Sequence, residues 1–73
     1  VLTVGAGVGT GVTAAGGVNI TGNLAVTGDT VIATETPASA SATGTAGQIA
    51  WDASYIYICT ATNTWKRVAI TTW

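Results

Sequence analysis

The sequence predicts an all-β fold: a trimeric β-helical or β-prism stem of hexad repeats, followed by a small C-terminal β-hairpin or meander that holds the trimer together. Three observations support this fold. Gly and β-branched residues dominate and no apolar stripe with a helical period is present, which disfavours helices. A six-residue repeat runs through the first half. The last part holds all three tryptophans and both tyrosines, so a core can form only there.

The stem, residues 1–35, is predicted from hexads that begin at Ala6. The first and third places of each hexad are mostly apolar, and the last two hold Gly, Thr, Asn, Asp or Glu. Side chains two apart share one face of a strand, and Gly or Asn beside them permits a corner. Such periods are typical of β-helical stacking. The predicted stem core consists of Val18, Ile20, Leu24, Val26 and Ile32.

Length and charge indicate that the stem needs other copies of the chain. Five hexads would give fewer than two turns of a single-chain triangular β-helix, whereas solenoids need about three repeats or more. Only five of the 73 residues are charged although 48% are hydrophobic, which favours an obligate homo-oligomer. We therefore expect a homotrimer. The alternative for the Gly-rich segment 1–17 is a flexible linker.

The segment 36–47 is rich in Pro, Ser, Ala and Gly, and the hexad is lost there. Pro37 cannot donate a hydrogen bond to a strand ladder and biases Thr36 toward an extended shape. The sequence therefore predicts a linker between the stem and the C-terminal module.

The C-terminal module, residues 48–73, is predicted to be a meander of three strands. Alternating apolar and aromatic residues indicate strands at 48–51, 55–61 and 64–70. Turns are expected at 52–54 and 62–63. The middle strand is the longest of the three.

Alternation along the middle strand places Tyr57 and Cys59 on one face and Ile56 and Ile58 on the other, so both faces are apolar. A strand buried on both sides in so small a unit needs a second surface, which the same module of a symmetry mate can supply. The predicted trimer interface consists of Ile49, Trp51, Tyr55, Tyr57, Ile58, Trp65, Val68, Ile70 and Trp73.

The polar residues offer little chemistry. The chain has no histidine, and its three acids are widely spaced at predicted corners and turns, so we expect no enzyme, cofactor or metal site. Cys59 is expected to be a buried, inert thiol. Lys66 and Arg67 must point to opposite faces, and one should reach the rim or stack on an aromatic ring. A net charge of -1 argues against nucleic acid, and Gly and Thr interrupt every apolar run, which argues against a membrane span.

Several runs resemble those of known proteins. The runs 47–52, 55–59 and 63–68 resemble the C-terminal modules of bacteriophage tail-fibre and other virion fibre proteins, and 18–29 resembles their Gly- and Thr-punctuated β-stem repeats. The module is also similar in plan to foldon, the trimerising hairpin of a T-even phage fibritin. Its matching positions are Pro37, Gly47-Gln48 and Trp65, although the middle strand here is longer.

The resemblance implies a non-enzymatic structural component on the exterior of a phage particle, as a tail fibre, whisker or head decoration. Its partners would be its own copies and other virion proteins. The alternative is a receptor-binding tip that recognises a glycan or protein of the host surface.

Overall fold

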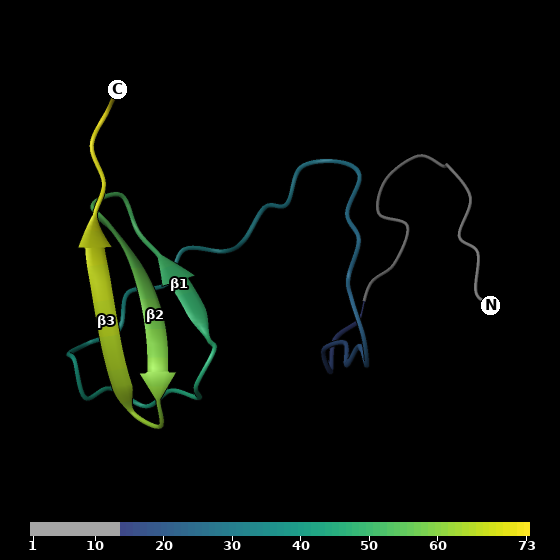
Figure 1. The fold of residues 1–73 in the computed structure, drawn as a ribbon, viewed down its shortest axis with the longest axis horizontal. Helices are drawn as coiled ribbons and strands as arrows, with labels where there is room; N and C mark the ends of the chain where they lie inside the picture. The colour runs from purple at the N-terminus through teal and green to yellow at the C-terminus, as the bar shows by residue number, and fades with distance from the viewer. Residues whose placement is uncertain (1–13) are drawn as a thin grey trace.

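The structure, a computed structural model, describes residues 14–73. Its ordered part is a three-stranded antiparallel sheet in the order β1-β2-β3, built from β1 (Ile49–Trp51), β2 (Tyr55–Ala61) and β3 (Thr64–Ala69) (Figure 1). The described residues contain no helix, so the all-β prediction is confirmed, and each strand lies within one residue of its expected bounds. In this part of the chain no helix is therefore long or apolar enough to cross a membrane.

The register of the sheet places four apolar residues on one face. Ala50 pairs with Tyr57 across β1 and β2, and Cys59 pairs with Trp65 across β2 and β3. These four side chains form the buried core, each no more than 6% exposed. The predicted burial of Cys59 is confirmed, since its thiol is free and fully buried.

The turn between β2 and β3 consists of Thr62 and Asn63. Asn63 has a positive φ of 53°, a left-handed conformation that Asn adopts more readily than most residues. Its backbone N–H donates to the Gly44 carbonyl at 3.0 Å, and its side-chain Oδ1 accepts from the Gly44 N–H at 3.0 Å. This reciprocal pair fastens the segment before β1 to the tip of the hairpin.

The segment 36–47 crosses one face of the sheet instead of only joining two modules (Figure 1). The Ala40 carbonyl accepts from the Trp65 backbone N–H at 2.8 Å, and the Ala42 carbonyl accepts from the Trp65 indole Nε1 at 3.1 Å. Farther along, the Gly47 N–H donates to the Cys59 carbonyl at 2.7 Å. We call the sheet face beneath this segment, with Ala50, Tyr57, Cys59 and Trp65, the covered face.

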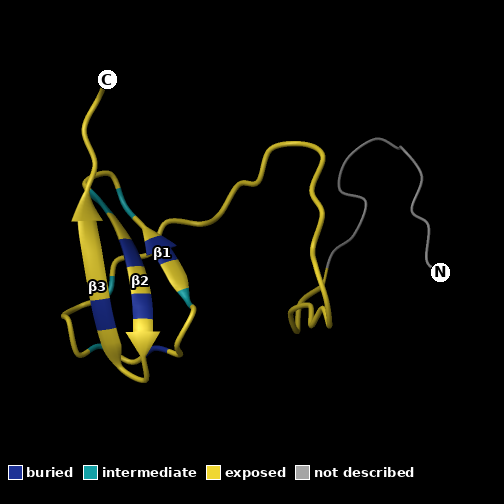
Figure 2. Ribbon diagram, in the orientation of Figure 1, coloured by how far each residue is buried: buried dark blue, intermediate teal, exposed yellow. Residues whose placement is uncertain are grey.

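The opposite side of the sheet has no cover among the described residues. Figure 2 shows burial confined to short stretches of the three strands and the segment before them, while residues 14–36 are exposed. We call this side the apolar face. It consists of Ile49, Trp51, Ile56, Ile58 and Val68, which are 37% to 59% exposed.

Residues 14–35 form an arm that extends away from the sheet (Figure 1) and contains no strand. Its bends fall at 15–16, 21–22 and 27–28, one every six residues, with extended chain between them. Positive φ values of 90° and 111° at Gly17 and Gly22 explain the choice of glycine at two of these corners. The corners lie one residue earlier than the sequence predicts. The start of the repeat and most of the 1–17 linker alternative lie outside the described residues.

The predicted stem core lies exposed on the arm of the single chain. Val18, Ile20, Leu24, Val26 and Ile32 are 46% to 70% exposed, because no second strand packs on them within residues 14–73. Two hydrogen bonds tie the base of the arm to the sheet. The Trp51 indole donates to the Ile32 carbonyl at 2.7 Å, and the Glu35 N–H donates to the Trp51 carbonyl at 3.0 Å. The interwound stem stays a prediction.

Candidate functional site

Asp52, in the turn after β1, organises the end of the sheet. Its Oδ1 accepts from the backbone N–H groups of Ser54 at 2.8 Å and Tyr55 at 2.9 Å, which shapes the turn into β2. Its Oδ2 accepts from the Thr36 hydroxyl at 2.8 Å and from the Tyr57 hydroxyl at 2.5 Å. One carboxylate thus joins the start of the segment 36–47, the turn and the buried aromatic residue of β2.

These hydrogen bonds change the acidity of both partners. The hydroxyl of Tyr57, followed by the Ser54 backbone N–H, holds the pKa of the Asp52 carboxyl well below its usual range. The same bond to Asp52 raises the pKa of the Tyr57 phenol above its ordinary value. The folded state therefore favours an ionised Asp52 and a protonated Tyr57.

The stability of the module should accordingly fall at both ends of the pH scale. A depressed carboxyl pKa stabilises the fold above the unfolded value of about 3.9, and this stability is lost as the pH falls below it toward the folded pKa. A raised phenol pKa stabilises the fold below about pH 10, and this stability is lost as the pH rises above it. Thermal unfolding followed by circular dichroism from pH 2 to pH 11 measures both losses.

Asp52→Asn is expected to melt earlier at pH 7 and to lose less stability in acid than the unmodified chain. Asp29→Asn, which removes an exposed acid of the arm, serves as the control and should leave the acid transition unchanged. Equal acid losses in the unmodified chain and in Asp52→Asn would contradict the role assigned to this carboxylate.

The apolar face is continuous across all three strands. The register aligns Trp51 with Ile56 and Ile56 with Val68, and one row farther along it aligns Ile49 with Ile58. Large apolar residues that stand in adjacent rows form a contiguous patch, and such patches on small soluble proteins mark sites of association. The face is therefore a candidate surface for another protein chain.

The two basic residues lie at the free edge of β3. The guanidinium carbon of Arg67 lies 4.1 Å from the centre of the Tyr55 ring, a cation–π contact that confirms the expected stacking of one cation on an aromatic ring. Tyr55 in turn lies against Tyr57, with their ring centres 5.8 Å apart. Arg67 is thus held on the side of the covered face.

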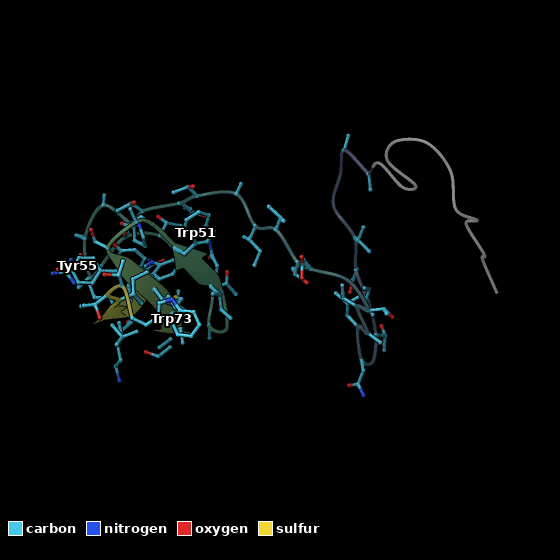
Figure 3. All side chains as sticks on the ribbon, turned by 90° about the horizontal axis from the view of Figure 1, so that it is seen from above. Trp51, Tyr55 and Trp73 are labelled. Carbon is cyan, nitrogen blue, oxygen red and sulfur yellow. The ribbon has the colours of Figure 1, made fainter. Side chains whose placement is uncertain are left out.

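The structure divides the predicted trimer-interface residues between surfaces. Tyr57 and Trp65 are buried within the chain's own core, and Tyr55 is half-buried beside them. The remaining residues are exposed, namely Ile49, Trp51, Ile58, Val68, Ile70 and Trp73. Figure 3 shows Trp51, Tyr55 and Trp73 lying apart from one another around the module. The trimer interface itself stays a prediction, and Tyr57 and Trp65 already have partners inside one chain.

Sequence reasoning missed two residues that shape this region. The sequence predicts only that Asp52 lies in a turn, although an Asp at the first position of a turn typically accepts a hydrogen bond from the backbone N–H two residues later, as in an Asx turn. Gly44 is buried against the ring of Trp65. No sequence signal distinguishes it from the other small residues of the segment 36–47.

Two phage proteins are similar to part of the chain. The capsule K30/K69-specific depolymerase of Klebsiella phage K64-1 is 62% identical over 37 residues, which are 51% of this chain and 5% of that protein. Depolymerase 1, capsule K30/K69-specific, of Klebsiella phage K5-2 is 56% identical over 36 residues, which are 49% of this chain and 4% of that protein. The matched residues are thus about a twentieth of the length of these relatives. No protein-family profile and no solved structure matches the chain significantly.

These matches support a phage tail protein of the fibre or spike type, with a location in the tail of the particle. The predicted resemblance to phage fibre proteins is thus confirmed at the level of a tail fibre or spike protein. The resemblance to a particular C-terminal module and the similarity to foldon stay predictions.

The expectation that the protein is not an enzyme is wrong. Both relatives are named as depolymerases, and depolymerases are enzymes, although the match covers only a short part of each. The lack of histidine and of clustered acids describes a stretch of 73 residues. Catalytic groups of a protein many times longer can lie elsewhere in its chain, so the composition of this stretch carries no conclusion about the whole.

Proposed function

We propose that the chain is an assembly segment of a phage tail fibre or spike that degrades a bacterial capsule. In this proposal three copies associate through the apolar face of the β-module, and the arms wind around one another as a stem. The observation that carries it is the asymmetry of the sheet. The segment 36–47 covers one face, whereas the face with Ile49, Ile58 and Val68 is left open.

Self-association suits this face because its neighbourhood is equally apolar and almost uncharged. Lys66 is the only charged residue in its rows, since it pairs with Ile58, and its long side chain can reach the rim. The exposed Val31 and Ile32 lie beside Trp51 and extend the apolar surface to the base of the arm. Burial of this surface between copies would remove a contiguous exposed apolar area of the module from water.

The arm supports a threefold arrangement in this proposal. Corners recur every six residues, and the apolar residues between them are exposed in one chain. Three arms wound about one axis would turn these residues inward in successive layers, as hexapeptide stacking requires. The module would then fix the register of arms whose repetitive sequence allows them to slip.

Light scattering on the 73-residue chain tests the proposal. The unmodified chain should have the mass of a trimer, and Ile56→Glu should shift it to a monomer, because it places a charge between Trp51 and Val68 on the apolar face. Thr62→Glu, which adds the same charge at the exposed hairpin turn, is the matched control and should remain a trimer. A monomeric unmodified chain, or a trimer that survives Ile56→Glu, would contradict the proposed interface.

A further inference from the structure

Lys66 carries a positive charge on an otherwise apolar surface. It pairs with Ile58 in the sheet, so its side chain lies on the apolar face, in the same row as Ile58 and Ile49. It lines a hollow of about 250 Å³ on that face, whose walls include Ile56, Ile58 and Val68. A copy that covers the face removes water from around this ammonium group. Because a charge that loses its water is costly without a partner of opposite sign, an acid beside Lys66 would stabilise the assembly.

The chain has three acidic side chains, Asp29, Glu35 and Asp52. Asp52 is already satisfied, because its carboxylate accepts from four donors, and one of these is the hydroxyl of Tyr57 on the covered face. The other two acids are exposed and belong to the arm. Asp29 and Glu35 are therefore the two acidic side chains that remain for Lys66.

Glu35 is the acid whose position is fixed relative to the sheet. Its backbone N–H donates to the Trp51 carbonyl at 3.0 Å. The hydrogen bonds of Ile32 and Thr36 to the end of β1 and the turn after it hold the chain on both sides of residue 35. Asp29 lies beyond these contacts, one hexad farther out on the arm. Glu35 is thus held beside β1, next to the apolar face, whereas Asp29 is not.

A pair between Glu35 and Lys66 is unfavourable within one chain. β1 and β2 lie between Glu35 and β3, and three strand spacings of about 4.8 Å place the two residues about 14 Å apart across the sheet. Lys66 also lies two residues along β3 from Val68, which stands in the row of Trp51. Both side chains would have to be fully extended toward each other, which costs their rotamer entropy. The partner of Lys66 is therefore better supplied by another copy.

A ring of three copies brings the two residues together. Around a threefold axis every contact is heterologous, so one side of a sheet meets the opposite side of the next sheet. Lys66 lies on β3, one edge of the sheet, and Glu35 lies outside β1, the other edge. Figure 1 shows β3 and the arm on opposite sides of the module. The β3 side of one copy, with Lys66, therefore faces the β1 side of its neighbour, with Glu35.

We propose that Lys66 of each copy forms an ion pair with Glu35 of the neighbouring copy, at the rim of the apolar interface. The inference rests on the proposed function, since only an assembled ring holds the pair. Charge pairs at a rim contribute mainly specificity, because they exclude arrangements that place like charges together. Three such pairs would determine how each sheet is placed against the next.

Charge reversal in the 73-residue chain tests the pair. Lys66→Glu brings two acids together at every contact, and Glu35→Lys brings two cations together. Each should raise the protein concentration at which half of the chains are trimeric about tenfold. The chain with both substitutions has opposite charges again and should return to within about twofold of the unmodified chain. Sedimentation equilibrium measures these concentrations, and the melting temperature of the trimer should rank the variants in the same order. The differences should shrink in about 1 M NaCl.

Asp29→Lys is the matched control, because it makes the same change of charge one hexad farther out on the arm. Alone it should leave the trimer unchanged, and combined with Lys66→Glu it should not restore assembly. Lys66 and Glu35 are exposed in the single chain, so circular dichroism should show a folded module in every variant. If Lys66→Glu unfolded the sheet, Glu35→Lys would still test the pair, because residue 35 lies outside the strands.

A mixture of the two single variants shows whether the pair joins different chains. A ring of one variant has three contacts with like charges. A ring with both variants has two contacts with opposite charges and one with like charges. The mixture should therefore assemble more strongly than either variant alone and less strongly than the unmodified chain. A pair within one chain would gain nothing from mixing.

Four outcomes would overturn the inference: single variants that assemble like the unmodified chain, a double variant that assembles no better than the single ones, restoration by Asp29→Lys, or no gain from mixing. The same samples separate this test from that of the assembly. A monomeric unmodified chain would reject the proposed assembly itself. A trimer that Ile56→Glu dissociates and that charge reversal leaves intact would reject the ion pair alone.

Discussion

Replacing Trp65 with alanine is expected to unfold the β-module, because the free energy of unfolding should fall by about 3–5 kcal/mol. The indole is 6% exposed and is the largest side chain of a core with only four buried residues. Its removal also leaves the Ala42 carbonyl without the donor that it meets at 3.1 Å. A domain of this size has little stability to spare, so a loss of this magnitude is enough to populate the unfolded state.

The loss should occur within each chain and not only between chains. Trp65 packs beneath the segment 36–47, so its contacts are present in a single copy. Urea unfolding, followed by far-ultraviolet circular dichroism at several protein concentrations, measures this. The difference between Trp65→Ala and the unmodified chain should be present at every concentration, although assembly would make each transition depend on concentration.

Trp73→Ala is the matched control for this substitution. It removes the same side chain from a position that is fully exposed beyond the end of β3. We expect its unfolding in the single chain to be unchanged. If Trp65→Ala proved as stable as Trp73→Ala, the covered face would not be the core of the module.

The strands could be predicted because the C-terminal sequence has clear turn signals and a regular alternation of side chains. Asp52 to Ser54 and Thr62-Asn63 mark the turns, and the alternation between them sorts side chains to two faces. The same alternation placed Lys66 and Arg67 on opposite sides, which the stacking of Arg67 on Tyr55 fits. Turns and the alternation of side chains depend only on neighbouring residues, so both can be predicted from a single sequence.

The cover of the sheet could not be predicted, because the residues that make it resemble a linker. Ala40, Ala42 and Gly44 have little apolar surface of their own, and small residues between two modules usually indicate a spacer. Their small size is what lets the backbone approach the Trp65 ring and accept hydrogen bonds from the indole N–H and the backbone N–H of Trp65. The sequence predicts that a symmetry mate covers the sheet. Because the segment 36–47 covers one face within the chain, this prediction now applies only to the apolar face.

The arm shows the limit of a periodic pattern in a single chain. The pattern predicts where the chain bends, because corners depend on Gly and its neighbours within each hexad. It does not supply strands, because a ladder needs a partner at each layer and residues 14–35 have none in one chain. The predicted stem core can therefore be buried only if several chains assemble.

Gly44→Ala should destabilise the module by about 1–3 kcal/mol, as expected when an atom is forced into a filled space. A Cβ at this position would lie 2.8 Å from three atoms of the Trp65 indole. Neither side can yield easily. Residue 44 is held by its two hydrogen bonds to Asn63, and the indole is held by its bond to Ala42. Thermal unfolding by circular dichroism measures the loss.

Gly28→Ala is the matched control, because a Cβ there would meet no atom within 4 Å and its φ is not positive. It should leave unfolding unchanged. A double-mutant cycle then assigns the clash to the indole. Trp65→Phe removes the part of the ring that meets the new Cβ, so Gly44→Ala should cost less in a Trp65→Phe chain than in the unmodified one. An equal cost in both chains would mean that the strain at residue 44 comes from its backbone, and that the close fit between segment and ring does not hold the cover in place.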